Sequence, residues 1–358
     1  MNAQSMATRK TAFIPSFGQR KLTINAQAVE ARRSWFNNGC NSTQIDGLAT
    51  SPTSRFMEQL LLKEEPNTPK FNEALIRFSK DKKIENNLYM LNDAYQHKDS
   101  IKVLLDHFKS MNLADDIYQN VMKYFPSKYK PAYDFQIFLS ATGWKWGDAM
   151  TFNYDTQDKN YLITEKGTPA ITFNQTLIYE IYGKSYAKRM EIFKQVASHE
   201  LFHAMFSDYR QQYWATKKEE MSINDQFYLF LLNEGIAHYV ADRDMLKEKY
   251  NLDNKLRKHE TAAFASLADS IKIIFDAKLP EEKRFNTMNS GLYGDYWNKY
   301  LCITGLFMAY HLDQLLGRNA LHQAVENGPK YFVKAYVSLQ KKHIDLPVLQ
   351  AEVIRESF

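Results

Sequence analysis

The stretch ASHELFHAMF at residues 197–206 holds two histidines four positions apart, His199 and His203, with Glu200 directly after the first. Residues four apart on an α-helix project to the same face, so the two imidazoles can hold one ion together. Glu200 is turned by about 100° from His199 along the helix, which leaves its carboxylate free for a water molecule at the metal. The spacing predicts one Zn²⁺ per chain, with Glu200 as the general base of a hydrolysis.

A catalytic zinc ion takes three protein ligands and keeps one position open. Glu234 is an acid in the middle of LLNEGIAHYVAD, residues 231–242, which is otherwise strongly apolar. A buried carboxylate is costly unless it is paired or binds a metal, so we expect Glu234 to be the third ligand. His238, one turn later on the same face, is the alternative ligand.

Two long helices are needed to position these residues. The zinc-binding motif lies in an amphipathic segment that begins near Ser185 and continues well past the motif. Glu234 lies in a second such segment, residues 226–250, for which Asn224 or Asp225 is the expected N-cap. The remainder of the chain is mostly helical in its pattern.

The spacing of apolar residues changes from a helical to a strand-like pattern before the zinc-binding motif, which predicts a small sheet. Residues 133–141, 160–165 and 169–175 are rich in aromatic and β-branched side chains and are expected to be strands. The stretch between the first two is turn-like. ITFNQT, within and just after the third strand, is expected at the sheet edge beside the zinc helix, where an extended peptide could add a strand.

The N-terminal part of the chain carries no residues that demand chemistry. Residues 37–54 are rich in Asn, Ser, Thr and Gly and read as a loop or linker. Residues 55–124 hold several short segments with apolar side chains at i, i+3 and i+4, which predict amphipathic helices.

The net charge of +5 on 358 residues could suggest a nucleic-acid partner. Residues 1–33, however, carry six basic residues and one acid, so this segment accounts for the whole excess and no basic groove is expected. No run approaches the roughly 20 apolar residues of a membrane helix. Two cysteines cannot build a disulfide framework. We expect a cytoplasmic protein, with a targeting signal in the basic N-terminus as the alternative.

The two zinc motifs together resemble those of the gluzincin metallopeptidases, whose third zinc ligand is a glutamate on a second helix. NEGIAHYV is similar to the N-E-G-x-A-x-Y-V stretch of aminopeptidase-N-like enzymes. The order of GWKWGDAM, ITFNQT, the zinc helix, NEGIAHYV and YLCITGLFMAYHLDQLLG is similar to that in a domain-of-unknown-function family assigned as zinc-dependent peptidases. This resemblance covers roughly residues 115–340.

Two departures from the resemblance concern the substrate. The gap between His203 and Glu234 is longer than in aminopeptidase-N-like or thermolysin-like enzymes, and no G-x-M-E-N segment precedes the motif. That segment holds the free amino end of a substrate in the aminopeptidases, so the resemblance does not imply aminopeptidase activity.

Peptide hydrolysis also needs a hydrogen-bond donor to the oxyanion and acids that orient the ligating imidazoles. In gluzincins the donor is often a tyrosine or histidine beyond the second zinc helix. Tyr293 ranks first here because it lies between two glycines of a loop that could move over the cleft. The other candidate donors are Tyr296, Tyr300 and His311. Asp208 and Asp242 are candidates for the orienting acids, and a solvated helix charge is the alternative for each.

The expected fold class is α+β, mostly helical and zincin-like, with a small central sheet, the HExxH helix and a second zinc-ligand helix. We expect a basic, polar N-terminal arm and linker over residues 1–54, a helical N-terminal region over 55–126 and a metallopeptidase domain over 127–358.

The predicted function is zinc-dependent hydrolysis of peptide bonds, with a peptide or protein as the substrate. No nucleic-acid or membrane partner is expected, and the oligomeric state stays open. Two alternatives remain: a zincin-like helical scaffold or interaction protein without activity, and a zinc hydrolase of non-peptide amides. The scaffold would explain the long amphipathic helices, whereas the intact set of two histidines, base and buried glutamate favours an enzyme.

Overall fold

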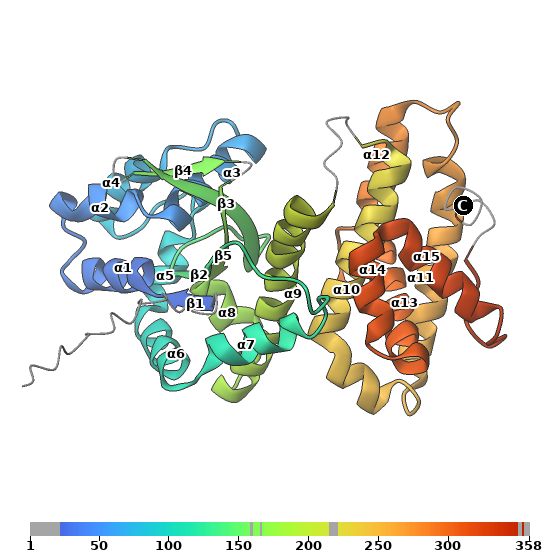
Figure 1. The fold of residues 1–358 in the computed structure, drawn as a ribbon. Coiled ribbons are helices and arrows are strands. Elements are labelled where there is room, and N and C mark those ends of the chain that lie inside the picture. Colours follow the sequence, from blue (N-terminus) through green and yellow to red (C-terminus); the bar gives the residue numbers. More distant parts are fainter. Residues whose placement is uncertain (1–21, 158–159, 165–166, 215–220, 350–352, 354–358) are drawn as a thin grey trace, which may run out of the picture.

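The computed structural model describes residues 22–157, 160–164, 167–214, 221–349 and 353. The long helix α9 (Tyr186–Tyr213) stands between two parts of the molecule (Figure 1). The sheet and the N-terminal helices lie on one side of α9, and the C-terminal helices lie on the other. The mostly helical α+β class expected from the sequence is confirmed.

The sheet has five strands in the order β1-β2-β5-β3-β4. Its first three strands are parallel to one another, whereas β3 runs antiparallel to both β5 and β4. The strands are β1 (Leu22–Asn25), β2 (Phe135–Ser140), β3 (Ala149–Gln157), β4 (Asn160–Thr164) and β5 (Thr168–Asn174).

Two expectations about the sheet were wrong. β5, which contains ITFN, is the central strand rather than an edge, so its backbone groups already pair on both sides and cannot receive a peptide. The stretch expected to be turn-like contains β3, the longest strand. In β3 the buried Phe152 and Tyr154 alternate with the more accessible Asn153 and Asp155, and this period of two outweighs the turn preference of the polar residues.

Seven α-helices lie between β1 and β2 in the chain, and those between residues 52 and 122 confirm the predicted amphipathic pattern. Their bounds are α1 (Gln27–Asn37), α2 (Ile45–Ala49), α3 (Pro52–Glu64), α4 (Phe71–Asp81), α5 (Leu91–Gln96), α6 (Lys98–Ser110) and α7 (Leu113–Met122).

Residues 22–54 are folded, in contrast to the arm and linker expected over residues 1–54. β1 pairs with β2, and α1 buries Trp35 in the core. Arg32 belongs to the expected basic arm, yet it is buried and donates to the carbonyl oxygen of Leu48 at 3.3 Å. Its guanidinium lies 4.8 Å from the centre of the Phe71 ring. Residues 1–21 lie outside the described residues, and the expected domain boundaries stay a prediction.

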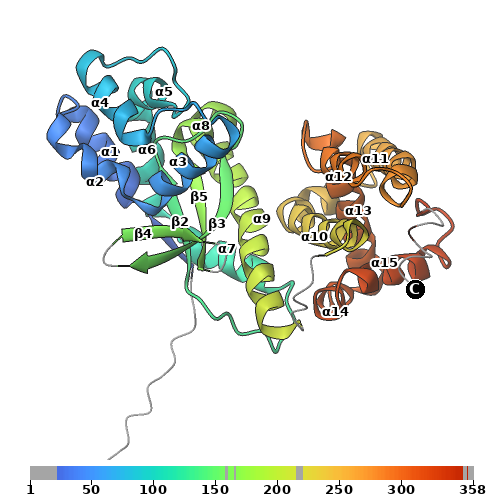
Figure 2. The same ribbon diagram turned by 90° about the horizontal axis from the view of Figure 1, so that it is seen from above.

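The C-terminal part is a layer of helices packed around α10 and α13 (Figures 1 and 2). No helix in the described part of the chain is long and apolar enough to cross a membrane. The remaining helices are α8 (Gln175–Ile181), α10 (Ile223–Lys249), α11 (Asn254–Ile274), α12 (Glu281–Ser290), α13 (Tyr300–Leu316), α14 (Asn319–Asn327) and α15 (Pro329–Gln340).

The two helices that carry the zinc motifs begin at serine caps. The Ser185 hydroxyl accepts a hydrogen bond from the Lys188 backbone N–H at 3.2 Å, as the sequence suggested for α9. In α10 the N-cap is Ser222, two residues before the earlier of the two expected caps, and its hydroxyl accepts from the Asp225 N–H at 3.1 Å. Capping satisfies backbone donors that would otherwise lack partners at each helix start.

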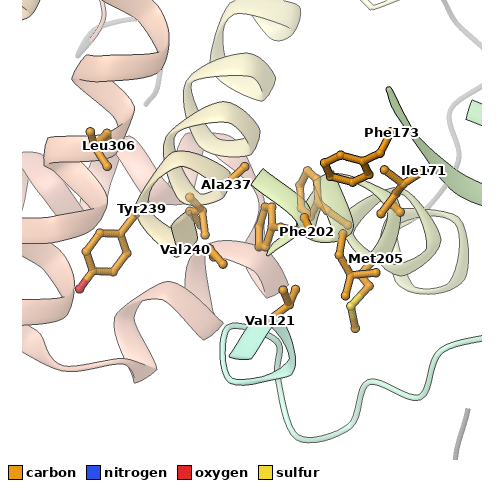
Figure 3. Packing of buried hydrophobic residues seen from close by; sticks show 14 of the residues in the cluster. Val121, Ile171, Phe173, Phe202, Met205, Ala237, Tyr239, Val240 and Leu306 are labelled. Carbon is orange, nitrogen blue, oxygen red and sulfur yellow. The ribbon is translucent and has the colours of Figure 1, made fainter. Parts of the chain in front are cut away.

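Buried apolar side chains join the two parts of the molecule through α9. Figure 3 shows Phe202 of α9 between Ala237 of α10 and Phe173 of β5, and all three are buried in one hydrophobic cluster. On the other face of α10, Leu306 of α13 belongs to the same cluster. The candidate metal ligands therefore lie on helices that are held by packing on two sides.

α10 and α13 approach each other at a pair of glycines, Gly235 and Gly305. A Cβ atom on Gly305 would lie 2.3 Å from the carbonyl oxygen of Leu231 and 2.7 Å from the Cα of Gly235. Only glycine fits at such a backbone contact. This crossing brings the first turn of α13 against Glu234, whose carboxylate lies 3.9 Å from the Cys302 thiol.

Candidate metal centre

Four side chains from α9 and α10 converge on one point. The Nε2 atom of His203 lies 2.9 Å from His199 Nε2 and 3.5 Å from Glu234 Oε1. Glu234 Oε2 lies 3.8 Å from His199 Nε2 and 4.0 Å from His238 Nε2. Ligand atoms around a tetrahedral zinc ion with bonds of about 2.0–2.2 Å are roughly 3.3 Å apart. The donor chemistry and the spacing of these atoms therefore fit a zinc ion.

The structure brings together the three residues predicted as ligands and adds a fourth. The ligand atoms of His199, Glu234 and His238 lie within 4.8 Å of one another and form a second possible set of three. His199 and Glu234 are common to both sets, so the sets differ only in His203 or His238. If all four residues bound the ion, no position would stay open for a substrate.

Asn233 orients one of the imidazoles, a role that sequence reasoning had assigned to aspartates. The His203 Nδ1 atom lies 3.1 Å from Asn233 Oδ1. With the amide oriented in this way, Nδ1–H donates to Asn233 and the Nε2 atom is turned toward the other clustered residues. The N-E dipeptide in the sequence could have indicated this role, because Asn233 directly precedes Glu234 in the same turn of α10.

The two expected aspartates have other partners. Buried Asp208 accepts hydrogen bonds from the Tyr129 hydroxyl at 2.7 Å and the Ala132 N–H at 3.0 Å, so it fixes the segment before β2 to α9. Asp242 accepts from the Tyr296 hydroxyl, and the Tyr296 ring packs edge-on against His238 with 5.3 Å between ring centres. Neither aspartate makes a hydrogen bond to an imidazole of the cluster in the part of the chain that the structure describes.

The candidate oxyanion donors differ in their surroundings. Tyr293 is 68% exposed on the segment between α12 and α13, and it makes no hydrogen bond or ring contact to the four clustered residues in the described ranges. The Tyr300 hydroxyl donates to the carbonyl of Thr287, and His311 is buried 2.7 Å from Glu260, away from the cluster. Only Tyr296 touches a residue of the cluster.

The electrostatics of the cluster favour an ionised Glu234. Burial alone would raise the pKa of its carboxyl group, but His203 outweighs burial and lowers this pKa to about 2. Burial would also lower the pKa of His203, yet the carboxylate of Glu234 raises it to about 9. An ionised carboxylate is the form that binds a metal ion.

The other two histidines are held neutral. Burial, followed by the positive charge of Lys299, lowers the pKa of His238 to about 3. Burial and the neighbouring histidines hold the pKa of His199 well below its ordinary value. Neutral imidazoles are the form in which histidine binds zinc.

Glu200 and Lys299 flank the cluster. Glu200 is half-buried, burial raises its pKa to about 7, and it makes no hydrogen bond or ion pair among the described residues. Lys299, the residue before α13, is half-buried, and its charge acts on His199, Glu200 and Glu234. Sequence reasoning missed Lys299 because its approach depends on the crossing of α10 and α13.

The comparisons with known proteins give one positive result. No curated protein and no solved structure matches the chain. One family model matches residues 46–344, which is more than half of the chain and includes all four clustered residues. By this match, the chain belongs to the family described as "Putative zinc dependent peptidase (DUF5700)".

Proposed function

We propose that the protein is a gluzincin-type zinc peptidase in which His199, His203 and Glu234 hold the ion. The observation that carries this proposal is the convergence of two imidazole nitrogens and one ionised carboxylate from two packed helices. Membership of a family described as zinc-dependent peptidases supports the same function. A bound zinc ion would supply Lewis-acid polarisation of water and of the substrate carbonyl group.

In this proposal Glu200 accepts a proton from water and returns it to the leaving amine. Its carboxylate is free for this role because no described side chain binds it. Asn233 keeps the proton of His203 on Nδ1, and the Glu234 carboxylate stays ionised through His203. His238 stays outside the ligand set, which leaves one position open for the substrate.

The residue that donates a hydrogen bond to the oxyanion has two candidates. Tyr293 stays the predicted donor, and Lys299 is a second candidate because its charge reaches Glu200 and Glu234. Removing one such donor lowers kcat by about 10²–10³-fold. The turnover of Tyr293→Phe beside that of Lys299→Met assigns the role, and an unchanged kcat in Tyr293→Phe rules out Tyr293.

A second candidate is a closed structural zinc site that fastens α9 to α10. It is favoured by the position of His238, whose Nε2 lies 4.0 Å from the Glu234 carboxylate and whose ring centre lies 4.5 Å from that of His199. With four protein ligands, the ion would stabilise a helical scaffold and catalyse nothing.

Cleavage of a peptide library by zinc-loaded wild type, Glu200→Gln and His238→Ala separates the two candidates. The peptidase proposal expects cleavage by the wild type, a loss of at least about 10²-fold in Glu200→Gln with its zinc retained, and a zinc-loaded His238→Ala. No cleavage by the wild type, together with loss of zinc in His238→Ala, would establish the structural site instead.

A further inference from the structure

A cleft of about 570 Å³ lies between α7, α9 and the C-terminal half of α10, and its lining includes Ser198, the residue before His199. α9 and α10 run in opposite directions here, because His199 faces His238 while His203 faces Asn233 (Figure 1). Ser198, directly before His199, therefore lines the cleft opposite the turn of α10 that follows His238. Both walls of the cleft begin within one helical turn of a clustered residue.

Most of the charged residues on the rim of the cleft neutralise one another. Lys194 lies 2.9 Å from Asp116, and Lys188 lies 2.9 Å from Glu191. Asp244 on the α10 wall is 76% exposed at its side chain and pairs with its neighbour Arg243. In the last turn of α10, Glu248 and Lys249 are both exposed and of opposite charge. Exposed pairs of this kind contribute little to binding.

Asp242 differs from these rim residues. Its carboxylate is partly buried, and among the described residues it has no cationic partner. Its Oδ2 atom accepts from the Tyr296 hydroxyl, which fixes the side chain, whereas its Oδ1 atom has no hydrogen-bond partner in the described ranges. A desolvated carboxylate without a counter-ion gains more from binding a cation than an exposed one does.

We propose that this cleft is a substrate subsite in which Asp242 binds a cationic nitrogen of the peptide. The nitrogen belongs to a lysine or arginine side chain or to a free α-amino group, since both offer the same charge and donors. Asp242 lies about 6 Å along α10 from His238, a span covered by one long side chain or two extended residues. This inference rests on the proposed peptidase function.

The test compares matched peptides that differ only in charge. A peptide with lysine near the cleaved bond and its norleucine counterpart are each made with a free and an acetylated N-terminus. A charge-assisted hydrogen bond contributes about 1.5–3 kcal/mol, which predicts a preference of about 10- to 100-fold in kcat/KM for the cationic peptide. A preference in kcat/KM that depends on the lysine identifies a side-chain subsite. A preference that depends on the free N-terminus identifies an α-amino subsite.

Asp242→Asn and Asp244→Asn are the paired variants, because both remove one acid from the same stretch of α10. The preference for the cationic peptide should vanish in Asp242→Asn and persist in Asp244→Asn. An equal preference in the wild type and Asp242→Asn would overturn the proposal, as would a wild type that cleaves charged and neutral peptides equally well.

A binding measurement keeps this inference separate from the proposed peptidase activity. Calorimetry on the full chain uses three probes: Nα-acetyl-lysine amide, norleucine amide and the uncharged Nα-acetyl-norleucine amide. If no peptide is cleaved, yet a charged probe binds the wild type at least about tenfold more tightly than it binds Asp242→Asn, the subsite stands while the peptidase proposal fails. If no charged probe is preferred over the uncharged one, the subsite is overturned.

Discussion

Among single residues, Glu234 makes contact with every histidine of the cluster. It lies within 4.0 Å of His199, His203 and His238, and its ionised form is maintained by His203. The sequence indicated this role because an acid in an apolar helix needs a partner. The sequence placed His238 on the same face one turn later, as the alternative ligand, but it could not show that both side chains reach the same point.

The hydrogen bond of Asn233 to His203 should raise the affinity for zinc. We expect Asn233→Ala to weaken zinc binding by about 10- to 100-fold, because the imidazole loses the group that fixes its tautomer and orientation. Competition with a chelator of known affinity measures the effect. Asn233→Asp keeps an oxygen at this position and should restore most of the affinity, and wild-type affinity in Asn233→Ala would remove the orienting role.

Asp242 should give the protein a pH-dependent stability. Burial raises the pKa of its carboxyl group to about 6 in the folded chain, opposed only by the Tyr296 hydroxyl. A raised acid pKa means that the folded state holds the proton more tightly. The stabilising contribution is therefore complete below the unfolded value of about 3.9 and is lost as the pH rises through 6.

The corresponding variant is Asp242→Asn, which cannot ionise. At pH 8 it should be more stable than the wild type by on the order of 1 kcal/mol, and this gain should shrink at pH 5. Urea unfolding at both pH values measures the difference. The same gain at pH 5 and pH 8 would show that ionisation of Asp242 carries no cost.

At the scale of secondary structure, the crossing of α10 and α13 sets the shape of the site. It requires glycine at Gly235 and Gly305 because the two backbones touch. A lone glycine within a helix, such as Gly235, is weak evidence of a close contact, and the sequence does not say which helix would pack against it. The structure identifies α13 as this partner. The same crossing determines the positions of Lys299 and Cys302.

Gly305→Ala should therefore be strongly destabilising. Its Cβ would press on backbone atoms at 2.3 and 2.7 Å, which can move only if the helices separate, and overpacking of this kind costs about 1–3 kcal/mol. Gly47→Ala in α2 is the matched control, since nothing lies within 4 Å of its Cβ. Thermal unfolding of both variants should show a lower Tm only for Gly305→Ala, and equal Tm values would contradict the close crossing.

The predictability of the elements followed the strength of their periodic signal. The helices of residues 55–124 and the two zinc-motif helices are long or strongly amphipathic, and most were found at the expected place, although α5 begins only at Leu91. β3 was not predicted because its Asn and Asp residues favour turns. Pairing with β5 and β4 makes this segment a strand. The central place of β5 depends on which strands flank it, and a local pattern cannot supply that.

At the scale of the whole molecule, the N-terminal segment belongs to the folded body. β1 is a strand of the sheet and α1 packs against β2. Trp35 is 1% exposed and donates from its indole N–H to the carbonyl of Asn41 at 2.8 Å. Composition hid this role because the basic and polar residues of the segment outnumber its apolar ones.

Trp35→Ala should cost about 3–5 kcal/mol of unfolding free energy, as expected for a large aromatic side chain in a core. Trp146→Ala is the control of the same type, because Trp146 is 53% exposed. Chemical unfolding followed by circular dichroism measures both. A Trp35→Ala variant as stable as the wild type would show that residues 22–54 do not contribute to the core.

The metal content of the purified protein tests the central claim most directly. Elemental analysis of the wild type, His203→Ala and Glu200→Gln is the single measurement. The proposed site predicts close to one zinc ion per chain in the wild type and Glu200→Gln, and loss of zinc in His203→Ala. Folded proteins without zinc in all three samples would contradict the metal centre and leave a helical scaffold.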